Sequence, residues 1–149
     1  MNISDFLSPA HIMIDVRERD KSRLLEKLST QAAADVGLAA HVVVREIVKR
    51  EELGSTGVGN GVALPHARIQ GLRAPFGLLA RLHNPIDFEA IDNQPVDVVF
   101  LLLLPEPPNP SRTNALACIA RALRDPEALQ SIRIATDVQT IFRELGKAG

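Results

Sequence analysis

The chain has 149 residues, of which 46% are hydrophobic and 23% are charged, with a formal net charge of −1 and a single cysteine, Cys118. This length is enough for one domain to bury a core without disulfide or metal support. The near-zero charge, with no block of like charges, excludes a broad nucleic-acid or anionic-membrane surface. The lone cysteine excludes an internal disulfide framework. We therefore expect one soluble, cytoplasmic domain over residues 1–149, with no signal peptide and no membrane-spanning segment.

The first third of the chain predicts one strand followed by two helices. Apolar and polar residues alternate over residues 11–16, which indicates a short strand. Asp20 is a candidate helix N-cap, apolar residues follow it at helical spacing, and Gly37 marks the end of that helix. A second amphipathic helix is expected over residues 40–53.

The middle of the chain predicts three strands. Val62–Leu64 is a short strand that Pro65 must end or confine to a sheet edge. Residues 76–82 form another strand, and the Asn84–Pro85 pair indicates a turn. The nearly continuous Val/Leu run over residues 96–104 is typical of a central strand that is buried on both faces.

The last third predicts helices over residues 113–123, from Asp125 onward, and over residues 137–145. Asp125 can cap its helix, and Pro126 is tolerated at the first helical position. The expected fold is a single three-layer α/β domain, in which a mixed β-sheet is flanked by helices on both faces.

A glycine-rich stretch, GSTGVGNGVALPH, runs from Gly54 to His66. It does not fit the familiar nucleotide-binding loops, because its glycine spacing is wrong for a dinucleotide fingerprint and no Gly-Lys-Ser/Thr follows. Two readings remain open. The glycines could simply allow positive φ in a tight turn, or their uncovered N–H groups could form an anion site beside His66.

A histidine that accepts a phosphoryl group has specific needs. One ring nitrogen must be unprotonated, while the other donates its proton to an acceptor that fixes the tautomer. The phosphoryl oxygens then need N–H, hydroxyl or guanidinium donors, because transfer depends on positioning and charge stabilisation. Neither a metal nor any other cofactor is required. A histidine at a strand end with open backbone around it would meet these needs.

Three segments carry a specific resemblance: ISDFLSP near the start, REELGSTGVGNGVALPHARI in the middle, and IDFEAIDNQPVDVVFLLLLP after it. Together they resemble the IIA components of the bacterial phosphotransferase system, in the fructose/mannitol superfamily and its nitrogen-regulatory (PtsN-like) branch. The resemblance implies the fold of that superfamily and the role of a phosphocarrier.

The resemblance also implies roles for individual residues. His66 would accept the phosphoryl group from a phosphohistidine of an HPr-type carrier, and Arg50 would balance the charge of the phosphate. A phosphate-binding loop would comprise Ser55, Thr56, Gly57, Gly59, Asn60 and Gly61. The output would be phosphorylation-dependent binding to regulatory or transport proteins, such as those of potassium and nitrogen control.

One position departs from the family pattern. Many members carry a second histidine after the long apolar strand, where this chain has Arg112. A guanidinium can pair with phosphate but cannot exchange protons near neutral pH. We therefore expect slower transfer or a flatter pH dependence. The alternative function is a non-phosphorylated regulatory binding module of the same fold with a degenerated site.

The other histidines and the cysteine are interpreted as structural or surface residues. His11 is expected to be a structural residue in a strand, His41 to face solvent and His83 to lie in a turn. No pair of histidines has the spacing of a zinc site, so no metal is expected. Cys118 is expected to be a buried packing residue.

Two further candidates concern His66. A hydrolase triad of Ser55, His66 and Asp92 is disfavoured, because the chain lacks a G-x-S-x-G nucleophile elbow. Asp92 is interpreted instead as a turn former. Glu106 is expected on the rim near His66 if the strands that precede these two residues end side by side.

Overall fold

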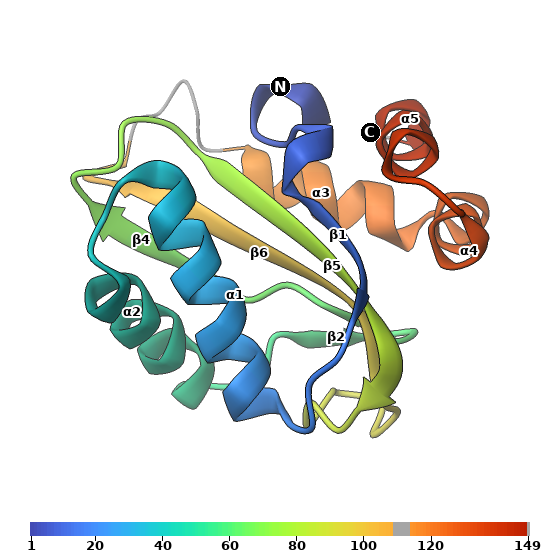
Figure 1. Ribbon diagram of the computed structural model, residues 1–149, viewed down its shortest axis with the longest axis horizontal. Coiled ribbons are helices and arrows are strands. Elements are labelled where there is room, and N and C mark those ends of the chain that lie inside the picture. Colours follow the sequence, from blue (N-terminus) through green and yellow to red (C-terminus); the bar gives the residue numbers. More distant parts are fainter. Residues whose placement is uncertain (109–113, 149) are drawn as a thin grey trace.

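The structure, a computed structural model, describes residues 1–108 and 114–148 (Figure 1). In chain order its elements are the 3-10 turns η1 (Ile3–Asp5) and η2 (Pro9–His11), then β1 (Ile12–Val16), α1 (Lys21–Val36), α2 (Ala40–Glu52), β2 (Gly57–Gly59), β3 (Val62–Ala63), β4 (His66–Gln70), β5 (Phe76–Ile86), β6 (Val96–Glu106), α3 (Ala115–Arg124), α4 (Pro126–Ile134) and α5 (Val138–Ala148). Among the described residues, no helix is both long and apolar enough to cross a membrane.

The six described strands form one mixed sheet in the order β1-β5-β6-β3-β2, with β4 also paired to β6. Strand β6 is antiparallel to β5 and parallel to both β3 and β4. Val62 of β3 lies opposite Val98, and His66 of β4 lies opposite Leu102. Strands β3 and β4 therefore follow one another along the same side of β6.

Helices cover both faces of this sheet, as the sequence predicts. Helices α1 and α2 lie on one face, and α3, α4 and α5 lie on the other (Figure 1). The side chains of β6 alternate between the two cores: Phe100 and Leu102 pack with α3–α5, whereas Leu101 and Leu103 pack with α1 and α2. Every residue from 98 to 103 is at most 1% exposed, which confirms the prediction of a central strand buried on both faces.

The predicted helix boundaries are largely confirmed. The Asp20 side chain accepts a hydrogen bond from the Arg23 N–H at 2.8 Å, which caps α1. Gly37 ends α1 with a left-handed φ of 73°, a conformation that glycine adopts without steric cost. Asp125 caps α4 by accepting from the Glu127 N–H at 3.0 Å, and Pro126 occupies the first turn of that helix.

The predicted turn at Asn84–Pro85 is wrong, because this pair lies inside β5. The pairing with β6 passes from Arg81 opposite Val98 directly to Ile86 opposite Val96, so β5 carries extra residues in between. A proline has no N–H to contribute to a sheet ladder, and such a bulge accommodates it. The residues Asn84 and Pro85 do interrupt the regular hydrogen bonding to β6, but strand β5 continues to Ile86.

His83 is consequently a strand residue and not a turn residue. Its Nδ1 lies 2.5 Å from Oδ1 of Asp15, which joins β5 to the neighbouring strand β1. The hydrogen bond from His83 holds the pKa of the Asp15 carboxyl below its usual value. His11 lies in η2 just before β1, where Nδ1 is 3.1 Å from Ser8 Oγ and the ring packs edge-on against Phe76.

Candidate functional site

His66 is the first residue of β4, a strand that the sequence analysis missed. Pro65 does end the pairing of β3, but the chain pairs with β6 again immediately, and the Pro65 carbonyl accepts the Leu102 N–H at 2.9 Å. Within β4 the side chains alternate: Ala67 and Ile69 are buried, whereas His66 is half-buried and Arg68 is exposed. The backbone of β4 is thus fixed by its core-facing residues, and His66 and Arg68 share the other face.

His66 lies in an open pocket of about 420 Å³ at the edge of the sheet. The pocket is bounded by the last turns of α2, by β4, by the end of β6 and by the first turn of α3. Its lining residues are Glu46, Lys49, Arg50, Leu53, His66, Ala67, Arg68, Leu104, Glu106 and Leu116. The pocket therefore combines one imidazole with three cations, two carboxylates and an apolar floor.

A hydrogen bond to the backbone fixes the tautomer of His66. The Nδ1 atom lies 2.8 Å from the carbonyl oxygen of Leu64. A carbonyl oxygen can only accept, so Nδ1 carries the proton and donates it. In the neutral ring, Nε2 then holds the unshared electron pair. The imidazole is arranged as a nucleophile or ligand through Nε2.

Two arginines and a lysine line the same pocket as the imidazole. Arg50, in the last turn of α2, donates from Nη1 to the Gly54 carbonyl at 3.0 Å, and Arg68 donates from Nη1 to the Pro105 carbonyl at 3.3 Å. A guanidinium carries five N–H donors, so one carbonyl does not exhaust it. Lys49 adds a third cation from the last turn of α2. The arrangement suits an anion with several oxygens.

The structure brings together some of the predicted residues. Arg50 and His66 line the same pocket, as the resemblance implies. Glu106 also lines it, but the expected reason was wrong. The parallel register of β4 and β6 places Leu104 opposite Arg68 and Glu106 opposite Gln70, at the other end of β4 from His66. Lys49 and Arg68 were not assigned to the site from sequence. The alternation of polar and apolar residues from His66 to Gln70 was the signal that could have placed Arg68.

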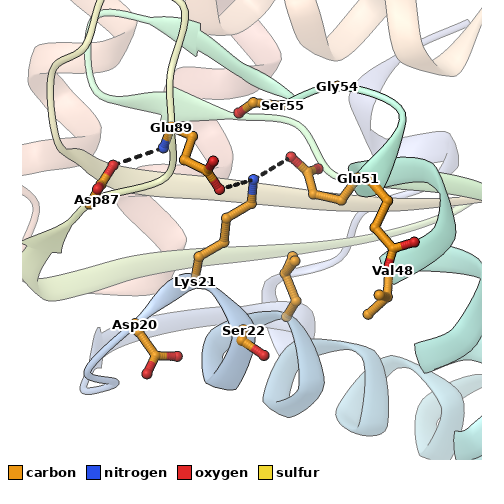
Figure 2. A pocket seen from close by; sticks show the side chains of 11 residues that line it. Asp20, Lys21, Ser22, Val48, Glu51, Gly54, Ser55, Asp87 and Glu89 are labelled. Carbon is orange, nitrogen blue, oxygen red and sulfur yellow. Dashed lines mark hydrogen bonds and ion pairs between the residues drawn. The ribbon is translucent and has the colours of Figure 1, made fainter.

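The predicted phosphate-binding loop is not brought to this pocket. The Ser55 hydroxyl donates to the Phe88 carbonyl at 2.8 Å and accepts from the Gly57 N–H at 3.0 Å. Thr56 is 4% exposed and is held by Glu51. Ser55 instead lines a second pocket, on the far side of α2, with Lys21 and Glu51 (Figure 2). The described lining of the His66 pocket includes no residue from 54 to 61.

The second half of that loop is a hairpin turn between β2 and β3. Asn60 and Gly61 have φ values of 58° and 78°, the pattern of a two-residue hairpin connection. The Asn60 N–H donates to Asp92 Oδ2 at 3.0 Å, and its carbonyl accepts from Arg133 Nη2. Gly57 and Gly59 pair with β3. These glycines therefore serve a tight turn, and the expected cradle of open loop amides around His66 is corrected.

Asp92 is a turn former, as predicted. Its Oδ1 accepts the Gln94 N–H at 3.1 Å, and hydrogen bonds from the backbone of Gln94 and Asn60 lower the pKa of the Asp92 carboxyl. It binds the hairpin turn and not the His66 imidazole, so the hydrolase triad is not assembled.

Cys118 is buried at 2% exposure in the α3–α5 core, which confirms its packing role.

Arg112 lies outside the described residues, so its predicted place beside His66 stays a prediction. Within residues 1–108 and 114–148, no group of three or more His, Cys, Asp or Glu side chains is arranged to hold a metal ion. The described site thus consists of His66, the cations Lys49, Arg50 and Arg68, and the carboxylates Glu46 and Glu106.

Comparison with known proteins identifies the class to which this fold and site belong. Residues 5–148 match the family described as phosphoenolpyruvate-dependent sugar phosphotransferase system, EIIA 2. The chain belongs to this family, whose IIA components carry phosphoryl groups. A nitrogen regulatory protein of Bradyrhizobium diazoefficiens is 43% identical over 145 residues, which cover 97% of this chain and 95% of that protein.

Solved structures agree with this assignment. The nitrogen regulatory protein IIA-Ntr from Neisseria meningitidis superposes with a TM-score of 0.89 and 30% identity, covering 96% of this chain and 98% of that one. The mannitol IIA enzyme of Escherichia coli, solved in complex with phosphorylated IIB, has a TM-score of 0.80 and 14% identity over 95% of this chain and 97% of its own. This second likeness shows a shared fold.

Proposed function

We propose that this chain is a phosphocarrier of the nitrogen-type phosphotransferase system. His66 accepts a phosphoryl group on Nε2 from a phosphohistidine of an HPr-like donor in the cytoplasm. Regulatory or transport proteins of potassium and nitrogen control then respond to its phosphorylation state. The observation that carries this proposal is the 2.8 Å hydrogen bond from His66 Nδ1 to the Leu64 carbonyl, in a pocket that also holds Lys49, Arg50 and Arg68.

The transfer is an in-line displacement at phosphorus. A bond forms between His66 Nε2 and phosphorus while the bond from phosphorus to the donor nitrogen breaks, and that electron pair returns to the donor imidazole. The proton stays on His66 Nδ1 throughout. As Nε2 becomes substituted the ring gains positive charge, and the Leu64 carbonyl stabilises that charge. No general base is needed, because Nε2 is already unprotonated in this tautomer.

The cations of the pocket act on the phosphoryl oxygens. A phosphoryl group carries about −1.5 to −2 charges near neutral pH, and charge-assisted N–H···O bonds from guanidinium groups are about twice as strong as neutral ones. Arg50 and Arg68 approach from different elements, α2 and β4, so they can hold different oxygens. The lining of three cations and two carboxylates carries a formal charge of +1, so this group turns the pocket from cationic to neutral or anionic, which alters the surface that a partner meets.

Mass spectrometry tests this proposal. The protein is incubated with enzyme I, an HPr-type carrier and phosphoenolpyruvate, and the expected result is an acid-labile mass increase of one phosphate. His66→Ala should abolish the label. His41→Ala, which alters an exposed histidine on α2 outside the pocket, should retain it. An unlabelled wild-type protein would contradict the proposal and favour a binding module that is not phosphorylated.

A further inference from the structure

Glu51 is a buried carboxylate that the proposed transfer does not use. It follows Arg50 directly in the last turn of α2, but its side chain lies on the other side of the helix, in the pocket of Lys21 (Figure 2). That side chain is only 4% exposed. Burying a carboxylate costs free energy unless it is paired and hydrogen-bonded. Glu51 therefore needs partners inside the protein.

Both carboxylate oxygens of Glu51 bind the same residue of the glycine-rich loop. Oε2 accepts the Thr56 N–H at 2.7 Å, and Oε1 accepts the Thr56 hydroxyl at 2.5 Å. Lys21 balances the charge, with Nζ 3.0 Å from Glu51 Oε2. Lys21 is itself held by the Phe88 carbonyl at 3.2 Å and lies over the Phe88 ring. Glu51 therefore clamps the loop at Thr56, and Lys21 supports the clamp from α1.

Thr56 is connected to His66 through two hydrogen bonds, one between backbone groups and one from the imidazole to the backbone. The Thr56 carbonyl accepts the Leu64 N–H at 3.0 Å, and the Leu64 carbonyl accepts the proton of His66 Nδ1 at 2.8 Å. The same loop segment supplies the Gly54 carbonyl that binds Arg50 at 3.0 Å. The acceptors for both His66 and Arg50 are thus anchored to the segment that Glu51 holds.

We infer that Glu51 is a positioning residue for phosphoryl transfer. By fixing Thr56 it fixes the Leu64 carbonyl, which keeps the proton of His66 on Nδ1 and leaves Nε2 free to react. It acts through this hydrogen-bonded chain and does not touch the phosphoryl group. The effect on transfer rate rests on the proposed function, whereas the effect on the His66 tautomer is independent of it.

The test compares Glu51→Gln with Asp15→Asn. Glutamine keeps the size of the side chain but loses the charge that Lys21 pairs with, and it cannot accept through both terminal atoms. Asp15→Asn weakens another ion pair, to His83 Nδ1 at 2.5 Å, in a pocket that does not include His66. The readouts are the imidazole ¹⁵N chemical shifts of His66, the rate of phosphorylation by the HPr-type carrier, and the denaturant midpoint.

Glu51→Gln should change the ¹⁵N chemical shifts of His66 toward those of a mixture of the two tautomers. It should also slow phosphoryl transfer by about tenfold or more, because small misplacements of reacting groups have effects of this size. Asp15→Asn should lower the midpoint while leaving the shifts and the rate as in the wild type. Wild-type shifts and rate in Glu51→Gln would overturn the inference. If that variant fails to fold, Thr56→Val removes a single hydrogen bond and must change the tautomer mixture in the same direction. An unphosphorylated wild-type protein would refute the proposed function, while the ¹⁵N shifts would still decide the role of Glu51.

Discussion

At the scale of single residues, the chemistry of His66 depends on a backbone carbonyl two positions earlier in the chain. The Leu64 carbonyl holds Nδ1 at 2.8 Å, so a backbone group, and not a side-chain carboxylate in contact with the ring, leaves Nε2 with the unshared electron pair. In the proposed transfer, Lys49, Arg50 and Arg68 would stabilise the charge on the phosphoryl oxygens. The backbone thus fixes the tautomer, and the side chains would stabilise the charge. Each of these two tasks can be tested separately.

Replacement of Arg50 tests the charge-stabilising task. Arg50→Ala should slow phosphorylation of His66 by roughly 10²- to 10³-fold, the usual cost of removing one preorganised donor. Arg50→Lys should lie in between, because it keeps the charge but loses the planar fork. Rates are measured from the time course of the mass increase. Arg143→Ala, which removes an exposed arginine on α5, is the control. An Arg50→Ala protein as fast as this control would remove Arg50 from the site.

Sequence reasoning succeeds where the position of a residue follows from local pattern or from family resemblance. Arg50 and His66 were expected together, and one pocket holds both. Ser55 and Thr56 could not be placed in the same way, because their partners, Phe88 and Glu51, are decided by packing on the far side of α2. Hydroxyl groups near a histidine in sequence are therefore weak evidence for contact with it.

At the scale of elements, the decisive feature is how β3 and β4 share one side of β6. Pro65 interrupts the pairing between them, and this break places His66 at the start of a new strand beside Leu102. From the sequence alone, Pro65 indicated only that the strand over residues 62–64 ends or lies at a sheet edge. The strand after it is five residues long, and its short polar–apolar alternation does not by itself reveal which strand it pairs with. Long-range pairing with β6 decides what local propensity leaves open.

Close packing of β5 on β6 gives a prediction about stability. A Cβ added at Gly77 would come within 2.4 Å of the Phe100 ring and 3.1 Å of the Phe6 carbonyl. Gly77→Ala should therefore lower the free energy of unfolding by about 1–3 kcal/mol, as overpacking does. In Gly146→Ala, the added methyl meets no atom within 4 Å, and this helical position should gain roughly 0.5–1 kcal/mol. Urea denaturation measures both values, and equal stability of the two variants would contradict this account of the packing.

At the scale of the whole molecule, the three-layer architecture was predictable because it depends on hydrophobic periodicity. The Val/Leu run of β6 and the apolar faces of the helices specify which surfaces must be buried. Short connections between the elements then limit the number of possible topologies. The course of the chain from Gly54 to Gly61 was not predictable from these signals. It is fixed by Glu51 near its start and by Asp92 and Arg133 from distant segments.

The architecture also brings together, in one pocket, the residues that the proposed transfer requires. Helix α2, strand β4 and helix α3 converge on the edge of the sheet beside the end of β6, so residues from separate segments meet there. Packed cores on both faces hold these elements, because residues 98–103 of β6 are buried throughout. The His66 imidazole thus lies on a strand whose neighbour in the sheet is buried on both faces, while its pocket stays open, as the proposed transfer between two proteins requires.

The most direct measurement is the site of the phosphoryl group on the ring. Phosphorylated, ¹⁵N-histidine-labelled protein is examined by NMR for coupling between phosphorus and the two imidazole nitrogens of His66. The account predicts coupling to Nε2, with Nδ1 still protonated. Coupling to Nδ1, or a phosphoryl group on any residue other than His66, would contradict it.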